Sequence, residues 1–292
     1  MNWLNEFAGR IEHDVPLSPL TWFKLGGRAR TMYRPADEEQ LARMVGRAYG
    51  DGVPTRVLGG GANVLIRDDG VDGIVIRLDQ PPFRTIEYQG ERVTAAGGVD
   101  LMRLTLDCVR RGLSGLECLA GIPGTVGGAI RMNAGGKFGV IGDAVSSVRL
   151  LTPEGTLETR HATELDFGYR RSNLGPRIVL SAEFQLRADD PQRVMARYEE
   201  IWACKKASQP LSENSAGCVF KNPPGRSAGK LIDQAGLKGE SVGAASVSRE
   251  HANFIITREG ATTADVLRLV ERIRETVRAR FGVELELEID IW

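Results

Sequence analysis

The chain has 292 residues, of which 42% are hydrophobic and 26% are charged, proportions typical of a globular protein with a sizeable core. Basic and acidic side chains number 38 each, so the formal net charge is zero. The chain therefore lacks the excess positive charge of a general nucleic-acid-binding protein, and we expect no nucleic-acid partner.

The sequence carries no signal for a membrane or for export. No apolar run approaches the ~18 residues of a membrane span, and the first residues lack the basic and apolar regions of a signal peptide. The four cysteines show no C-x-x-C spacing, so we expect reduced thiols in a cytoplasmic protein. The three histidines lie far apart, which disfavours a histidine-rich zinc site but leaves a carboxylate-bound ion open.

Helical and strand patterns alternate over the first part of the chain. Asp37 precedes apolar residues at helical spacing, and Gly50-Asp51-Gly52 ends this helix. A hairpin is predicted over residues 85–95, and a second helix runs from Asp100 to Gly112. Short strands are predicted over residues 55–58, 63–66 and 74–78.

The second part begins with strands, continues with helices and ends with another strand. A hairpin over 148–159 and a strand over 178–186 are predicted before Pro191, which begins a helix near a domain boundary. Apolar residues between Val266 and Val277 recur at i, i+3, i+4 and i+7, which predicts a long helix. Residues 284–291 alternate strictly and predict a half-buried strand.

Two glycine-dense loops carry the strongest functional signal in the residues themselves. The first, residues 59–63, opens a strand and not a helix, so it is not a Rossmann fingerprint. The second, residues 121–128, contains a Pro-Gly pair and the hydroxyl of Thr125. Either loop alone could be a simple turn, but glycines let backbone N–H groups approach an anion closely. We interpret the two loops as a cradle for cofactor phosphates, near a proton donor at Cys218.

Three further motifs also have ordinary explanations. Residues 167–172 place aromatic, basic and hydroxyl groups together, as a surface loop with arginines would. Residues 227–233 could simply be the start of a helix. Glu286, Glu288 and Asp290 could be the solvated acidic face of the last strand.

Seven segments carry a further signal, and they follow one another over essentially the whole chain. They are residues 21–27, 59–63, 121–128, 169–172, 217–223, 227–239 and 251–255, and include GIPGTVGG at 121–128 and GCVFKNP at 217–223. In these segments and in their order the chain resembles the UDP-N-acetylenolpyruvoylglucosamine reductase (MurB) family, in its shorter subtype.

The resemblance implies an α+β fold with an FAD-binding unit of the vanillyl-alcohol-oxidase (PCMH) type and a smaller α+β substrate-binding domain. It implies FAD-binding subdomains over residues 1–78 and 79–203, and a UDP-sugar-binding domain over 204–281. The last strand, within 282–292, is expected to return to the first subdomain.

The resemblance also implies the reaction. Members of the family reduce the enolpyruvyl ether of UDP-N-acetylglucosamine to a lactyl ether, which gives UDP-N-acetylmuramate for peptidoglycan. NADPH first passes a hydride to FAD, NADP then leaves, and the UDP-sugar occupies the same face. The sequence leaves the oligomeric state open and is compatible with a monomer.

Residue roles follow from the same resemblance. Arg170 is expected to clamp the substrate carboxylate, Glu288 to stabilise the developing charge, and Cys218 to donate a proton. The expected substrate-binding residues are Tyr169, Lys221, Asn222 and Lys230. The expected FAD-binding residues are Leu58, Gly59, Gly60, Gly61, Ala62, Asn63, Gly121, Ile122, Pro123, Gly124, Thr125, Gly127 and Gly128.

The chain departs from the family pattern at two positions. Most relatives have serine where this chain has Cys218; a thiol, with an unperturbed pKa of roughly 8.5, is the stronger acid and keeps a donor there. Asp290 stands where relatives usually have arginine. Glu286 therefore remains an alternative to Glu288 as the catalytic carboxylate.

Two other functions stay open. One is another flavoenzyme of the same cofactor fold, such as a sugar or alcohol oxidase; many of these attach FAD through a loop histidine, and the first glycine loop has none. This favours non-covalent FAD. The other is a non-catalytic UDP-sugar-binding protein, which the joint presence of Arg170, Cys218 and Glu288 argues against.

Overall fold

The computed structural model describes residues 2–292, which form two compact units. Unit 1 comprises the chain up to His13, Thr31–Gly60 and Asp72–Lys205, and unit 2 comprises Asp14–Arg30, Gly61–Val71 and Lys206–Trp292. None of the helices formed by these described residues is long and apolar enough to cross a membrane. The short 3-10 helices are Asn2–Arg10, Ser18–Leu20, Pro81–Arg84, Glu117–Leu119, Ile141–Ala144 and Ala162–Glu164.

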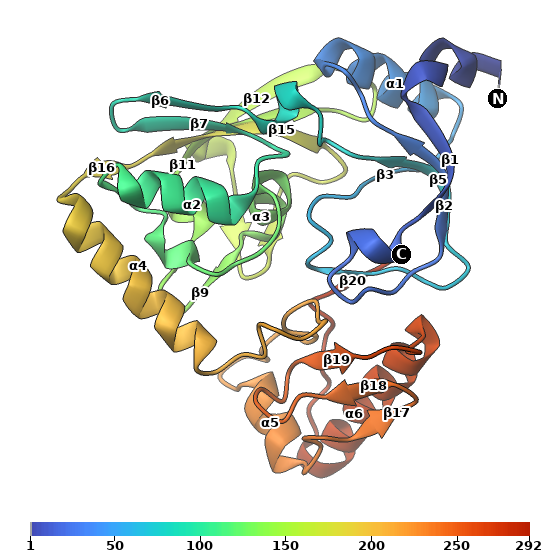
Figure 1. Ribbon diagram of the computed structural model, residues 1–292, viewed down its shortest axis with the longest axis vertical. Coiled ribbons are helices and arrows are strands. Elements are labelled where there is room, and N and C mark those ends of the chain that lie inside the picture. The colour runs from blue at the N-terminus through green and yellow to red at the C-terminus, as the bar shows by residue number, and fades with distance from the viewer. Residues whose placement is uncertain (1) are drawn as a thin grey trace. The chain divides into compact units, whose positions relative to one another are not determined.

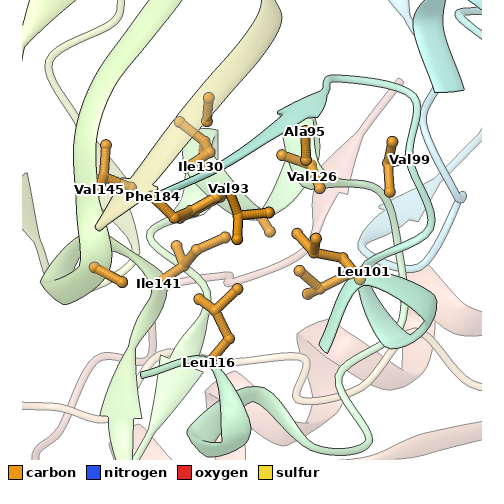
Figure 2. Close-up of a cluster of buried hydrophobic side chains, with 14 of the residues drawn as sticks. Val93, Ala95, Val99, Leu101, Leu116, Val126, Ile130, Ile141, Val145 and Phe184 are labelled. Carbon is orange, nitrogen blue, oxygen red and sulfur yellow. The ribbon is translucent and has the colours of Figure 1, made fainter. Parts of the chain in front are cut away.

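A five-stranded antiparallel sheet forms the centre of unit 1 (Figure 1). Helices α2 (Leu101–Arg110) and α3 (Val126–Met132) pack beside this sheet and bury a continuous apolar cluster with it, part of which Figure 2 shows. Val93, Val126 and Phe184 are fully buried in this cluster, so the core fixes the loop that leads into α3. In spatial order the strands are β12 (Leu157–His161), β11 (Val145–Leu151), β15 (Ile178–Gln185), β7 (Arg92–Ala96) and β6 (Ile86–Gln89).

A second sheet has the order β1-β2-β5-β3. Its parallel pair, β3 and β5, places Val57 opposite Ile76. Helix α1 (Glu38–Gly50) begins at Asp37, whose side chain accepts a hydrogen bond from the Gln40 N–H at 2.8 Å. Its apolar stripe packs with Ile74 and Ile76 in the second core cluster of unit 1. The strands are β1 (Ile11–Pro16), β2 (Arg28–Tyr33), β3 (Thr55–Val57) and β5 (Val71–Ile76).

Short hairpins and one long helix complete unit 1. Helix α4 (Pro191–Lys206) starts with the predicted proline, whose missing N–H costs nothing at a first helical position. Its last turn carries Trp202 and Lys205. The short strands are β8 (Leu113–Ser114), β9 (Gly135–Gly136), β10 (Gly139–Val140), β13 (Phe167–Gly168), β14 (Arg171–Ser172) and β16 (Arg187–Ala188).

Unit 2 is built on the antiparallel sheet β17-β18-β19, against which the long helix α6 packs. Its core also takes in Leu65 and Ile289, from segments far apart in sequence. The strands are β17 (Ser241–Val242), β18 (Ala245–Val247) and β19 (Ile255–Thr257), with β4 (Val64–Leu65) and β20 (Asp290–Ile291) as a separate parallel pair; the helices are α5 (Ala228–Gln234) and α6 (Thr263–Phe281).

Most helices and strands predicted from the sequence are confirmed, including the helix starts at Asp37, Asp100 and Pro191. The prediction of one continuous strand over 284–291 is wrong. The segment changes partner part-way, because Leu287 bridges to Phe220 and only Asp290–Ile291 then pairs with β4. The division into three domains stays a prediction.

Candidate active site

The two glycine loops are in direct contact through Gly59 and Gly60, which belong to unit 1 as the second loop does. A Cβ added to Gly60 would lie 2.7 Å from the Cα of Gly124, and one on Gly59 would lie 2.6 Å from the Thr125 hydroxyl oxygen. Neither distance leaves room for a side chain. The glycines therefore allow one loop backbone to approach the other, a reason that the sequence alone did not supply.

The backbone donors of this loop pair differ in whether residues 2–292 supply them with an acceptor. Among the described residues, no acceptor receives the N–H groups of Gly59, Gly60, Gly124 or Thr125. Unpaired neighbouring N–H groups suit an anion such as a phosphate. By contrast, two adjacent glycines of the second loop donate their N–H groups within the protein. Gly127 donates to the Gly97 carbonyl, and Gly128 donates to the Thr125 hydroxyl.

The other loop residues have mainly packing roles. Gly121 has φ +70°, and a Cβ there would clash with the ring of Trp202, so the end of α4 covers this residue. Ile122 donates its N–H to the Leu119 carbonyl at 2.9 Å. Gly61 belongs to unit 2, where a Cβ would clash with the Leu20 carbonyl oxygen.

Arg170 lies with Tyr169 at the turn of the β13–β14 hairpin in unit 1. Its φ of +54° is left-handed, which is uncommon for a residue other than glycine and recurs at functional sites. One guanidinium nitrogen donates to the Gly135 carbonyl at 3.0 Å, and the guanidinium carbon lies 5.3 Å from the centre of the Tyr169 ring. The Tyr169 side chain is exposed.

Lys205 is a candidate residue that the sequence analysis missed. Its Nζ donates to the Ala120 carbonyl at 2.6 Å, at the start of the second glycine loop. Burial and, to a smaller extent, the positive charge of Arg170 lower the pKa of Lys205 to about 8. A lysine at the end of a helix is usually a solvated residue, and only the fold shows that this one lies against the loop.

Cys218 and Glu288 lie on neighbouring backbone segments of unit 2. Cys218 forms a bridge with Phe254 on one side, and Phe220 forms a bridge with Leu287 on the other. The Glu288 N–H donates to the Val219 carbonyl at 2.8 Å. The chain thus holds the predicted proton donor and the predicted carboxylate on adjacent extended segments.

Buried Asn253 holds the segment that carries Cys218 from the other side. Its side-chain amide donates to the Phe220 carbonyl at 2.7 Å and accepts from the Phe220 N–H at 3.0 Å. Asn63, expected at the cofactor, donates its side-chain N–H to the Glu288 carbonyl at 3.1 Å. Asn253 occurs in a matched motif, yet no pattern in the sequence indicated its positioning role.

The two candidate carboxylates differ in their surroundings. The Glu286 side chain is 77% exposed and pairs with Lys221 at 3.4 Å. Glu288 is half-buried. A group that acts on developing charge is more effective where water is partly excluded, so half-buried Glu288 stays a better candidate than exposed Glu286.

Two of the three substrate-binding residues predicted in unit 2, Asn222 and Lys230, lie at the start of α5. Asn222 accepts the Ala228 N–H at 2.9 Å, and Lys230 is exposed in the first turn of α5. Lys221 is the partner of Glu286. Arg170 and Tyr169 belong to unit 1, so their placement beside Cys218 stays a prediction. The described residues contain no group of three His, Cys, Asp or Glu side chains suited to a metal ion.

Comparisons with known proteins match both parts of the chain. Residues 29–160 match the family of the FAD-binding domain, and residues 209–292 match the C-terminal domain of UDP-N-acetylenolpyruvoylglucosamine reductase. The enzyme of that name from Heliobacterium modesticaldum is 42% identical over 289 residues, which cover 98% of this chain and 92% of the relative. The one from Listeria welshimeri is 39% identical over 283 residues, which cover 96% and 95% of the two chains.

Solved structures agree with this assignment. The crystal structure of UDP-N-acetylenolpyruvylglucosamine reductase from Thermus caldophilus has a TM-score of 0.85 at 40% identity, and the match covers 97% of this chain and 99% of that one. The glucose dehydrogenase Phl p 4.0202 is 14% identical with a TM-score of 0.51 over 65% of this chain and 45% of its own, a likeness of fold alone. The predicted α+β fold with a cofactor unit of the vanillyl-alcohol-oxidase type is confirmed. This chain belongs to the UDP-N-acetylenolpyruvoylglucosamine reductase family.

Proposed function

We propose that the chain reduces UDP-N-acetyl-3-O-(1-carboxyvinyl)-glucosamine to UDP-N-acetylmuramate with NADPH, a step in making peptidoglycan precursors. The observation that carries the proposal is the pairing of the Cys218 and Glu288 segments, because the reaction needs a proton donor and a charge-stabilising group close together. Family membership supplies the substrate class.

The loop pair of unit 1 fits FAD. Its glycines leave backbone N–H groups of Gly59, Gly60, Gly124 and Thr125 without an acceptor among the described residues, as binding of a pyrophosphate requires. Bound FAD supplies the hydride transfer between NADPH and the substrate. The loops would hold the pyrophosphate, and the absence of a histidine from both favours a non-covalent cofactor.

Arg170 and Glu288 would stabilise the charge that develops on the substrate. Reduction of the terminal enolpyruvyl carbon pushes negative charge onto the adjacent carbon and its carboxylate. The Arg170 guanidinium can clamp that carboxylate with paired N–H donors. A protonated Glu288 would add a hydrogen bond to the enolate, and preorganised donors of this kind usually contribute more to catalysis than any other single effect.

Cys218 would complete the reaction by donating a proton to the carbon that becomes saturated beside the carboxylate. The thiol has a suitable acidity, since the ordinary pKa of cysteine is roughly 8.5. The two hydrogen bonds between the Asn253 side chain and the Phe220 backbone hold the segment that carries this thiol.

The UDP portion would be captured by unit 2 with help from Tyr169. Exposed Lys230 can contact a phosphate, and Lys221 and Asn222 lie on the same segment as Cys218. Asn222 also accepts the Ala228 N–H at 2.9 Å, so it orders the start of α5 as well. We also propose a cytoplasmic location, which the four free cysteines support.

The decisive experiment measures flavin absorbance of the purified protein together with NADPH oxidation, with and without the enolpyruvyl substrate. We expect a flavin spectrum and NADPH oxidation that depends on the UDP-sugar. Rapid NADPH- or sugar-dependent oxygen consumption without the substrate would indicate an oxidase. Tight UDP-sugar binding without turnover would indicate a binding protein, and either result would contradict the proposal.

A further inference from the structure

Arg77 lies directly behind the first glycine loop in unit 1. It follows β5, while Leu58 follows β3, and these two parallel strands end side by side with Val57 opposite Ile76. One guanidinium nitrogen of Arg77 donates to the Leu58 carbonyl at 3.2 Å and to the Gly59 carbonyl at 2.6 Å. Only 17% of the Arg77 side chain is exposed.

These two hydrogen bonds set the direction of two peptide groups. In a trans peptide the carbonyl of one residue and the N–H of the next point in opposite directions, and the described residues contain no cis peptide. Because Arg77 holds the Leu58 and Gly59 carbonyls, the N–H groups of Gly59 and Gly60 must point away from it. These are two of the donors that have no acceptor among the described residues.

A chain of ion pairs fixes the guanidinium in turn. Its Nε lies 3.4 Å from Asp79 Oδ2, and Arg34 pairs with the same carboxylate oxygen. Arg34 also contacts Glu12, with Nε 2.6 Å from Oε1. Burial would raise the pKa of Asp79, but the hydrogen bond from Arg34 and the charges of Arg34 and Arg77 together lower the pKa, so the carboxylate stays charged.

We propose that Arg77 is a positioning residue for the dinucleotide pyrophosphate, because it turns the N–H groups of Gly59 and Gly60 toward the anion and the carbonyls away from it. The inference rests on the proposed role of the glycine loops in binding FAD. Arg77 would act through the loop backbone and not through contact with the cofactor. Its positive charge, partly neutralised by Asp79, would also favour an anion on the other side of the loop.

The test compares FAD with riboflavin, which carries the same ring system but no pyrophosphate. Flavin-free protein is titrated with each ligand, and the ratio of the riboflavin Kd to the FAD Kd measures what the pyrophosphate and the adenosine contribute together. For Arg77→Met we expect about 10- to 100-fold weaker FAD binding, little change for riboflavin, and a ratio lowered by the same factor. Arg77→Lys, which restores a charge and donors, should recover part of the ratio.

Arg84→Met is the matched control. Arg84 is exposed, its charge is close enough to act on Arg77, and the described structure gives it no bond to the loop. This variant removes a nearby positive charge without freeing the carbonyls, so its ratio should equal that of the wild type. The melting temperature of each flavin-free variant shows whether it is folded; if Arg77→Met is not, Arg77→Gln takes its place with the same expectation.

The outcomes separate this inference from the proposed cofactor site. A wild-type ratio near one would mean that the loops do not bind the pyrophosphate, and both ideas would fall. A large wild-type ratio that the Arg77 variants leave unchanged would overturn only the role of Arg77. Equal weakening of FAD and riboflavin would make Arg77 a general support of the fold, which also overturns the inference.

Discussion

At the scale of single residues, Cys218 separates the two halves of the proposed reaction. Its proton is needed only after hydride has reached the substrate, so NADPH-driven flavin reduction should not depend on it. We expect Cys218→Ala to keep near-normal flavin reduction but to lose roughly 10²–10⁴-fold in reoxidation by the UDP-sugar, measured by stopped-flow absorbance.

Cys218→Ser is the matched variant for this test. A hydroxyl can also supply the proton, so this variant should keep substantial activity and resist alkylation at that position. Reoxidation of Cys218→Ala at the parent rate would show that another group, such as Glu288 or an ordered water, is the donor. Loss of both half-reactions would instead locate the defect in folding or flavin placement.

Lys205 should make the stability of the flavin-free protein depend on pH in a definite direction. Burial lowers the pKa of its ammonium group from 10.5 to about 8, so the folded protein carries an electrostatic penalty while Lys205 is charged in both states. That penalty is full below about 8 and disappears as pH rises toward 10.5, because the unfolded state then binds more protons than the folded one.

The measurement is urea unfolding of the flavin-free wild type and of Lys205→Met between pH 7 and 11. Relative to the variant, the free energy of unfolding of the wild type should rise across the interval from about 8 to 10.5. A flat difference across this interval would show that Lys205 is not desolvated in solution. The variant also loses the hydrogen bond to the Ala120 carbonyl, and this loss shifts its free energy of unfolding at every pH. The informative quantity is therefore how the difference in unfolding free energy between wild type and variant changes with pH.

At the scale of elements, the C-terminal segment decides which carboxylate is catalytic. Glu286 and Glu288 lie on the same segment, two residues apart, but only Glu286 is largely exposed and paired with Lys221. We expect Glu288→Ala to slow substrate-dependent reoxidation by about 10²–10³-fold, the range found when one stabilising donor is removed. Glu286→Ala should change the rate by less than about fivefold, since an exposed ion pair contributes only ~0–1 kcal/mol.

Both variants keep the backbone pairing with residues 219–221, which does not depend on the side chains. Rates are measured by single-turnover reoxidation, and the circular dichroism of each variant checks the fold. The reverse ranking, with Glu286→Ala the slower enzyme, would assign the catalytic role to Glu286.

Elements with local signals could be predicted from the sequence, and elements set by distant contacts could not. The capping side chains of Asp37 and Asp100 marked two helix starts correctly. Helix α3 was missed because Gly127 and Gly128 in its first turn disfavour a helix, whereas buried Val126 and Ile130 hold it in the core. The break in the C-terminal strand comes from a change of partner, which no local pattern contains.

The candidate site follows the same rule. Motif positions such as Cys218 and Glu288 were identified from the sequence, and their roles stay predictions. The supporting contacts join segments that are far apart: Lys205 reaches Ala120 across 85 positions, and Asn63 reaches Glu288 across 225. Such contacts depend on the complete fold, so the residues that position a site are harder to predict than those in its motifs.

At the scale of the whole molecule, a non-covalent cofactor links flavin binding to global stability. Ligand that binds only the folded state stabilises it by RT ln(1 + [L]/Kd), about 4 kcal/mol when free FAD is 1,000 times its Kd. We expect the melting temperature to rise with FAD concentration, and acid-denatured protein to release all its flavin to the supernatant, as measured by absorbance near 450 nm. Because neither glycine loop contains a histidine, no flavin should remain on the polypeptide. A coloured precipitate that keeps its flavin through denaturation would contradict the non-covalent assignment, and a melting temperature independent of FAD would show that the folded chain does not bind the cofactor.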